Sequence, residues 1–140
     1  AYEVYSLINS FSGVGIGRIG SLEKEMDLSS FLSHVKKQLN SDAIRHSHPP
    51  KKLIKKVAVV AGSGSFAIED AKQQGADAFI TADLKYHQFY QGEKSVLLVD
   101  VGHYESEHYV KNLIFDYLTK KLPNFAFVLS QTKTNPVNYF

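Results

Sequence analysis

A chain of 140 residues is long enough for one domain with a substantial hydrophobic core and too short for two complete domains. Hydrophobic residues make up 44% and charged residues 21%, as in globular proteins, and no apolar run approaches the ~20 residues that a membrane helix requires. Sixteen basic and fourteen acidic residues leave a net charge of +2, with the excess gathered in residues 51–56, so we expect neither a membrane nor a nucleic-acid partner.

The chain contains no cysteine, which excludes disulfides and thiolate metal sites. Any metal must therefore be held by nitrogen and oxygen atoms. No segment resembles a secretory signal, and we expect a cytoplasmic protein. The chain opens on an apparent strand, Tyr2–Ile8, and its one methionine is Met26, which indicates the carboxyl-terminal part of a longer protein or a trimmed chain.

Residues 13–20 (GVGIGRIG) contain the pattern G-x-G-x-x-G at Gly15, Gly17 and Gly20. In dinucleotide-binding proteins such glycines follow a strand and open a helix, whereas the next helix here is expected only near Asp27. We therefore interpret the segment as a glycine-rich strand and turn that another backbone approaches closely.

Asp27 is a suitable amino-terminal cap for a helix over Leu28–Leu39, whose apolar residues follow helical spacing and would cover a sheet. His46 and His48 follow in an extended loop, where alternate residues face the same way. A metal pair is conceivable there, but two histidines before a Pro-Pro pair and a lysine run are more typical of a solvated loop.

An apolar strand over Lys55–Ala61 leads into the loop Gly62-Ser63-Gly64-Ser65 and a helix over Phe66–Gln74. A small-residue loop between a strand and a helix offers backbone N–H groups to an anion. The loop lacks the Gly-Lys-Ser/Thr ending of a nucleotide P-loop. Two interpretations stay open, a contact with a phosphate or carboxylate and a plain tight turn.

Gly75 ends that helix, and Asp77–Thr81 forms a buried strand. Asp83 and His87 follow it, four residues apart. Ligands of open α/β sheets collect beyond the carboxyl ends of the strands. We therefore expect Asp83 and His87 to lie beside a metal or a substrate, with helix capping by Asp83 as the alternative.

The next strand, over Ser95–Val99, runs into Asp100 and a glycine turn. His103 and Glu107 then lie four residues apart at the start of a helix expected over Tyr104–Leu122, and this spacing places both side chains on one helix face. We expect the helix to bury one apolar stripe, made of Val110, Leu113, Ile114, Tyr117 and Leu118.

His103 and Glu107 continue this stripe, so an imidazole and a carboxylate are expected to point inward, which is costly unless a partner compensates them. A divalent metal is the natural partner, and a hydrogen-bonded pair on the first helical turn is the alternative. Asp100 or a backbone carbonyl would orient the other nitrogen of His103. Glu105 and His108 point away from this face and are expected to be solvated.

Pro123 ends the helix, and a last strand is expected over Phe125–Ser130. Strands and helices alternate along the chain with short connections. This order predicts an α/β fold, a three-layer sandwich with a mixed, largely parallel sheet.

Five segments together resemble, in order and spacing, the carboxyl-terminal half of the Nif-three-like dinuclear-metal-centre proteins, also known as homologues of a type-two GTP cyclohydrolase: GVGIGRIG, VAVVAGSGS, ADAFITADLKYH, VDVGHYESE and NPVNYF. The specific part is TADLKYH followed by DVGHYESE, although Ala82 stands where the family usually has glycine. Residues 1–8 are similar to the exit strand of an inserted domain, which leaves residues 9–140 as the metal-site domain.

The resemblance implies a homohexamer with two divalent metals, Zn, Fe or Mn, in each full-length subunit. His103 and Glu107 match the family's GHxxxE ligands, while the remaining ligands belong to an amino-terminal half that has no counterpart here. We therefore expect this chain alone to bind metal weakly or not at all and to be inactive.

Two classes of function follow for the full-length protein. The first is a metal-dependent hydrolase, similar to a GTP cyclohydrolase, that acts on a small anionic or nucleotide-like substrate. The second is a non-enzymatic assembly or regulatory protein whose metals are structural. A Ser-His-Asp hydrolase using Ser63 or Ser65 is a weak third, because neither serine lies in a G-x-S-x-G frame.

Overall fold

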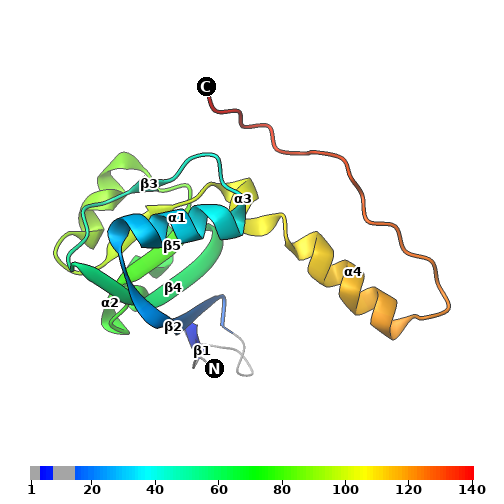
Figure 1. Ribbon diagram of the computed structural model, residues 1–140, viewed down its shortest axis with the longest axis horizontal. Coiled ribbons are helices and arrows are strands. Elements are labelled where there is room, and N and C mark those ends of the chain that lie inside the picture. The colour runs from blue at the N-terminus through cyan, green and yellow to red at the C-terminus, as the bar shows by residue number, and fades with distance from the viewer. Residues whose placement is uncertain (1–3, 8–14) are drawn as a thin grey trace.

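The computed structural model describes residues 4–7 and 15–140. Its centre is one mixed sheet with the strand order β1-β2-β4-β5-β6-β3 (Figure 1). The strands span Val4–Leu7 (β1), Gly17–Asp27 (β2), Arg45–His46 (β3), Leu53–Ser63 (β4), Ala78–Ala82 (β5) and Leu97–Asp100 (β6). The three central strands β4, β5 and β6 are parallel, and β1, β2 and β3 pair antiparallel on either side.

Helices cover both faces of this sheet. They span Leu28–Leu39 (α1), Ile68–Gln73 (α2), His103–Glu107 (α3) and Val110–Lys121 (α4), with 3-10 helices at Ser65–Ala67 (η1) and Tyr86–Gly92 (η2). One core cluster joins Phe31 and Val35 of α1 to one face of the sheet, and the other joins η1 and α2 to the opposite face, with Phe89 of η2 packed against it. The expected three-layer α/β sandwich is therefore confirmed.

The helix α1 has the bounds expected from the sequence. Its cap is Asp27, whose Oδ1 accepts the backbone N–H of Ser30 at 2.9 Å. Such a bond satisfies an amide that has no partner within the helix. Phe31 and Val35, one helical turn apart, are both buried against the sheet.

The glycine-rich segment lies largely in β2, because Gly17 and Gly20 are strand residues that pair with β1, and Gly20 also pairs with β4. This confirms the strand interpretation over a dinucleotide loop. The first expected strand is confirmed as β1, while residues 2–3 and 8 and the start of the glycine run, residues 13–14, lie outside the described residues.

Asp77 joins the start of β5 to the start of β4. Its Oδ2 accepts the N–H groups of Lys55 and Lys56 at 3.0 and 2.9 Å, and its Oδ1 accepts the Lys51 ammonium at 2.5 Å. Burial raises the pKa of Asp77, but the hydrogen bonds from Lys51, Lys56 and Lys55 outweigh it and bring that pKa below its ordinary value.

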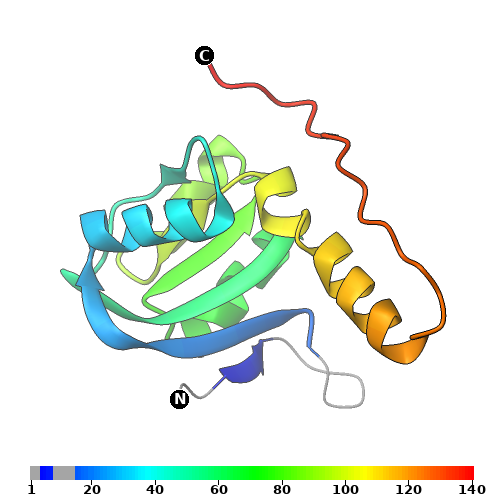
Figure 2. The ribbon, with the colours of Figure 1, turned by 45° about the vertical axis from the view of Figure 1, so that its right-hand side comes forward.

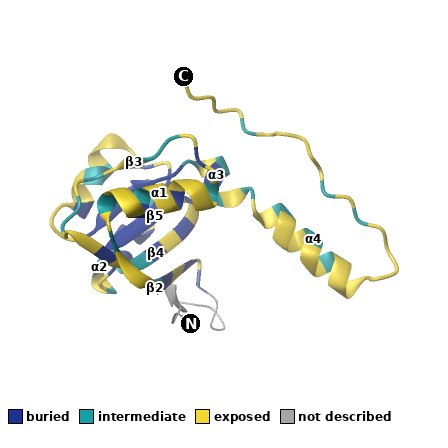
Figure 3. Ribbon diagram, viewed as in Figure 1, coloured by how far each residue is buried: buried dark blue, intermediate teal, exposed yellow. Residues whose placement is uncertain are grey.

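The prediction of one long helix after the last central strand is wrong in two respects. It is divided into α3 and α4 at His108 and Tyr109, and α4 has no buried residue. The stripe expected to be buried is largely exposed, with Leu113 at 70% and Tyr117 at 60%. Figure 1 shows α4 projecting from the body, and Figure 3 shows it coloured mainly as exposed.

The strand expected over Phe125–Ser130 is also wrong. Residues 122–140 form an extended tail without sheet pairing, and Val128 is 92% exposed. The tail runs from the far end of α4 back toward α3 (Figure 2). Within the described part of the chain, no helix combines the length and the apolar character needed to cross a membrane.

Candidate metal centre

The carboxyl ends of the parallel strands meet at one edge of the sheet, and three polar segments follow them. Gly62 lies at the end of β4, Asp83 directly follows β5, and His103 begins α3 after β6. This edge is where open α/β sheets bind ligands. The parallel order thus brings together side chains that are far apart in the sequence.

His103 lies between two carboxylates. Its Nδ1 is 2.6 Å from Oδ2 of Asp83, and its Nε2 is 3.1 Å from Oε2 of Glu107. An ionised carboxylate only accepts hydrogen bonds, so Nδ1 carries the proton that Asp83 accepts. The side chains of His103 and Glu107 are 51% and 48% exposed, so the expectation that they are buried is wrong. They open into a cleft instead.

The two carboxylates change the acidity of the imidazole. The hydrogen bond from Asp83 raises the pKa of His103 above its ordinary value, burial opposes this shift, and the charge of Glu107 adds to it. Asp83 also adopts a φ of 56°, in the left-handed region that residues other than glycine seldom occupy. Backbone strain of this kind is concentrated at functional sites.

His103 and Glu107 form the hydrogen-bonded pair that the sequence left as the alternative, and their separation would also suit two ligands of one divalent ion. Ligands with bonds of about 2.0–2.2 Å lie roughly 3 Å apart when they are neighbours in the coordination shell, and Nε2 and Oε2 are 3.1 Å apart. Asp83 is not placed to be a third ligand of the same ion. Its carboxylate lies on Nδ1 of His103, on the opposite side of the ring from Nε2 and Glu107. Among the described residues, no three His, Asp or Glu side chains form a group that could hold a metal.

Gly62 leaves the space in which this pair lies. A Cβ on Gly62 would be 2.2 Å from Oε1 of Glu107 and 3.3 Å from Cε1 of His103, and the residue has a φ of +64°. Its N–H donates to Oγ of Ser106 at 2.9 Å, and its carbonyl accepts the hydroxyl of Thr81 at 3.0 Å. The φ of +64° favours glycine at this position, and an added Cβ would also displace the half-exposed end of the Glu107 side chain.

Gly62 and Gly64 belong to the loop for which the sequence analysis offered two interpretations, an anion contact and a tight turn. A Cβ on Gly64 would lie 2.3 Å from Oγ1 of Thr81, so close packing against β5 explains this glycine. Ser63 is the exposed last residue of β4, and Ser65 opens the three-residue η1. An anion contact here stays a prediction.

Asp100 has a different position from the one expected, because Asp83 and not Asp100 contacts His103. Asp100 is 4% exposed and forms an ion pair with Arg45. Its Oδ2 accepts the N–H of Leu84 at 2.9 Å, and its Oδ1 accepts the N–H of Gly102 at 3.2 Å. Asp100 therefore ties the residue after Asp83 to the residue before His103, which fixes the two loops relative to each other.

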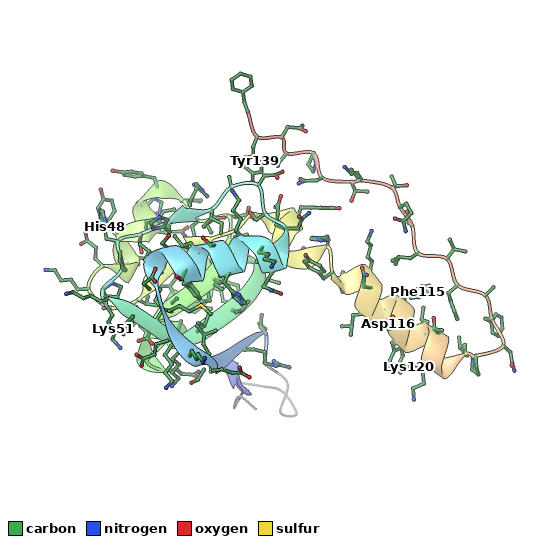
Figure 4. All side chains as sticks on the ribbon, in the orientation of Figure 1. His48, Lys51, Phe115, Asp116, Lys120 and Tyr139 are labelled. Carbon is green, nitrogen blue, oxygen red and sulfur yellow. The ribbon has the colours of Figure 1, made fainter. Side chains whose placement is uncertain are left out.

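His46, His48 and His87 lie apart from this pair, whereas His108 lines the same cleft. His87 is exposed on η2, and it is not among the residues that line the cleft. His46 is exposed on the short edge strand β3, and Figure 4 shows His48 on the side of the body away from α4. The solvated-loop interpretation agrees with the exposure of both.

A cleft of about 740 Å³ lies between α3, the start of α4 and the tail. Asp83, His103 and Glu107 line one part of it, and Arg45 and Lys111 add positive charge. Asp100 and Glu105 also line the cleft, so four carboxylates lie against two cationic side chains, of which Arg45 is already paired with Asp100. The charge of the cleft therefore suits a cation such as a metal ion better than a free anion.

Glu105 also differs from the expectation that it is solvated. It is 5% exposed, not solvated, and its Oε1 accepts Nδ2 of Asn135 in the tail at 3.1 Å. Burial raises the pKa of Tyr139, and the charges of Glu105 and Asp100 add to this effect. Sequence reasoning missed these contacts, because helical spacing gives no indication of where a distant tail lies.

Comparison with known proteins gives a consistent group of relatives. A model of the family described as Duf34/NIF3 (NGG1p interacting factor 3) matches residues 3–136. A GTP cyclohydrolase 1 type 2 homolog of Staphylococcus epidermidis is 35% identical over 136 residues, covering 94% of this chain and 37% of the relative. The Bacillus subtilis protein of the same name is 34% identical over 144 residues, covering 99% and 38%. This chain therefore spans well under half the length of these relatives.

Solved structures have the same fold. The Staphylococcus aureus protein SA1388 superposes with a TM-score of 0.78 at 29% identity, over 90% of this chain and 42% of that protein. A Bacillus cereus protein related to NIF3 superposes with a TM-score of 0.76 at 32% identity, over 90% and 36%. The similarity thus extends over most of the chain in both sequence and structure.

Proposed function

The chain belongs to the Duf34/NIF3 family, and from this premise we propose that it is the carboxyl-terminal part of a metal-dependent hydrolase with a dinuclear centre. His103 and Glu107 are its ligands to that centre. The observation that carries the proposal is the separation of 3.1 Å between Nε2 of His103 and Oε2 of Glu107, beside a glycine that leaves room for both.

Each side chain at the edge has a defined part in this proposal. Asp83 accepts the proton on Nδ1 of His103 and so leaves Nε2, on the side of Glu107, as the ring nitrogen that would bind a metal. Asp100 fixes the loop after β5 relative to the loop after β6. Gly62 leaves space for the Glu107 carboxylate. Two bound Zn, Fe or Mn ions would supply Lewis-acid activation of water and neutralise charge on an anionic substrate. The remaining ligands come from the rest of the full-length protein.

The proposed substrate is small and anionic, of the nucleotide class. Arg45 and Lys111 line the same cleft as His103 and Glu107 and would contact an anion there, while the bound metals would offset the charge of the four carboxylates that also line it. The name of the curated relatives, GTP cyclohydrolase 1 type 2 homolog, makes GTP the first nucleotide to test.

A second function is a non-enzymatic assembly protein with structural metals. The supporting observation is the apolar stripe of α4, whose members are exposed in this chain: Val110 at 55%, Leu113 at 70%, Ile114 at 52% and Tyr117 at 60%. A contiguous apolar face of this kind marks a surface that another protein segment covers. In the full-length protein it would contribute to a homohexamer.

Replacing His103 by alanine in the full-length protein distinguishes the two functions. His46→Ala, an exposed histidine on β3, is the matched control. Metal content, GTP turnover and the oligomeric state by light scattering are measured together. Loss of metal and turnover with an intact hexamer supports the hydrolase. Loss of assembly, in a parent protein that turns over no substrate, supports the second function.

A further inference from the structure

The tail reaches the body at few points, and one of them is the metal-ligand helix. Lys111 Nζ donates to the carbonyl of Ser130 at 3.1 Å, and Asn135 Nδ2 donates to Oε1 of Glu105 at 3.1 Å. Beyond this point Tyr139 lies where the tail passes back over the body (Figure 4). The contact at Asn135 is notable because Glu105 lies between His103 and Glu107 on the same helix.

The side chain of Asn135 is held in a fixed orientation. Its Oδ1 accepts the N–H of Val137 at 3.1 Å, which leaves both protons of Nδ2 directed away from the local backbone. One of them is donated to Glu105. The amide therefore cannot exchange its two ends without losing both hydrogen bonds.

Glu105 is buried on the side of α3 that faces the tail. A Cβ on Gly102 would be 2.2 Å from Oε2 of Glu105 and 3.4 Å from the hydroxyl of Tyr139, so this glycine admits the carboxylate beneath the tail. Among the described residues, Asn135 is the one side chain with a recorded hydrogen bond to Glu105. A buried carboxylate needs such a donor, because desolvation without one is costly.

The helix α3 has only five residues and is separated from α4 by a turn, so its own hydrogen bonds constrain its orientation weakly. Two neighbouring residues are instead held by two different segments, β4 and the tail. Ser106 accepts the N–H of Gly62 at the end of β4, and Glu105 accepts the amide of Asn135 from the tail. The rotation of α3 determines how His103 and Glu107 face each other.

We propose that Asn135 is a positioning residue, which acts through Glu105 to fix the rotation of α3 and with it the geometry of His103 and Glu107. This role rests on the proposed function of those two residues as metal ligands. The tail segment 135–139 is then part of the metal centre although it contacts no ligand atom. Groups that hydrogen-bond directly to metal ligands typically change affinity by about 10–100-fold when they are replaced, so an indirect positioning residue is expected at the lower end of this range.

A reversal of the hydrogen bond in the full-length protein tests the proposal. Asn135→Asp keeps the shape of the side chain but places a second carboxylate against Glu105. Glu105→Gln in the same protein restores the hydrogen bond in the reverse direction, because the glutamine amide then donates to the aspartate carboxylate. This second change also returns the net charge to that of the wild type. Asn138→Asp, the same change at an exposed position of the tail, is the matched control.

The first measurement is the dissociation constant for Mn²⁺ or Zn²⁺. We expect Asn135→Asp to weaken binding by at least about tenfold, the double variant to return within about threefold of the wild type, and Asn138→Asp to have no effect, each measured under conditions in which all four proteins are folded. A loss in Asn135→Asp that the second substitution does not reverse, or no loss in a protein that binds metal, overturns the proposal.

The second measurement does not depend on metal. In the metal-free protein, hydrogen exchange reports on the amides of Ser106 and His108, which bond to the carbonyls of Gly102 and Tyr104 within α3. We expect Asn135→Asp to accelerate their exchange about tenfold over the Asn138→Asp control. Equal exchange overturns the positioning role. A third outcome is faster exchange in a protein whose metal binding does not require His103. That outcome would support the structural contact of Asn135 and reject the proposed function of His103 as a ligand.

Discussion

Asp83 and His103 come from different strand ends and meet at 2.6 Å, with the carboxylate on Nδ1 of the imidazole. The contact orients the ring so that Nε2 faces Glu107. It also favours the protonated imidazole, because each ring nitrogen then donates to a carboxylate. A proton on Nε2 and a metal ion compete for the same lone pair.

Replacing Asp83 by asparagine should therefore lower the pKa of His103 in the metal-free chain. The wild-type pKa is expected above the ordinary value of 6.5, and the variant closer to it. Since the folded-state pKa is raised, the stabilisation from the protonated ring is present below pH 6.5 and is lost as the pH rises through the folded-state value. Titration of the His103 ring by NMR measures the pKa in both proteins, with the His103 signal assigned by its absence in His103→Ala. An unchanged pKa would reject the role of Asp83.

Gly62→Ala should displace Glu107 and destabilise the chain by about 1–3 kcal/mol, because it combines a positive φ with a Cβ 2.2 Å from Oε1 of Glu107. Gly75→Ala is the matched control, since its φ is +72° but nothing lies within 4 Å of the added Cβ. It should cost about 1 kcal/mol through φ alone. Denaturant unfolding gives both values, and equal losses would argue against the close approach at Gly62.

Asp77→Asn should destabilise the fold by about 1–3 kcal/mol at neutral pH, because Asp77 is 8% exposed and accepts three hydrogen bonds. The pKa of Asp77 is lowered from its ordinary value of 3.8. Its contribution is therefore present above pH 3.8 and is lost as the pH falls through the folded-state pKa, so the difference from wild type should shrink in acid. Unfolding measured at several pH values tests this, with Asp116→Asn, an exposed residue of α4, as control.

Leu113→Ser should leave the stability of this chain nearly unchanged, because Leu113 is 70% exposed on α4. In the full-length protein the same change should weaken assembly, since it would remove an apolar side chain from a covered face. Asn112→Ser, exposed on the same helix, provides the control. Light scattering over a dilution series measures the oligomer, and an assembly as stable as that of the control would show that α4 is not covered.

The parts of the fold that depend on local chemistry were predictable. The cap at Asp27 and the spacing of Phe31 and Val35 define α1, and the alternation of strands and helices predicted the parallel centre of the sheet. The failure at α4 has a physical reason. Helical spacing identifies an apolar stripe, but it does not show whether anything covers that stripe, which depends on a partner surface.

The candidate site was predictable only in part. Spacing of four residues indicated that His103 and Glu107 share a face, and their side chains are 3.1 Å apart. Predicting the contact between Asp83 and His103 would require knowing the order of the strands in the sheet. Predicting the burial of Glu105 would require knowing the path of the tail. Neither follows from local periodicity, because both depend on contacts between segments that are 20 or 30 residues apart.

The most direct test of the proposed metal centre is anomalous diffraction from crystals of the full-length protein grown with Mn²⁺ or Zn²⁺. We predict an anomalous peak about 2.0–2.3 Å from both Nε2 of His103 and the Glu107 carboxylate, with Asp83 still on Nδ1 of the ring. Metal peaks found only elsewhere, with His103 and Glu107 still paired to each other, would contradict the assignment of these residues as ligands.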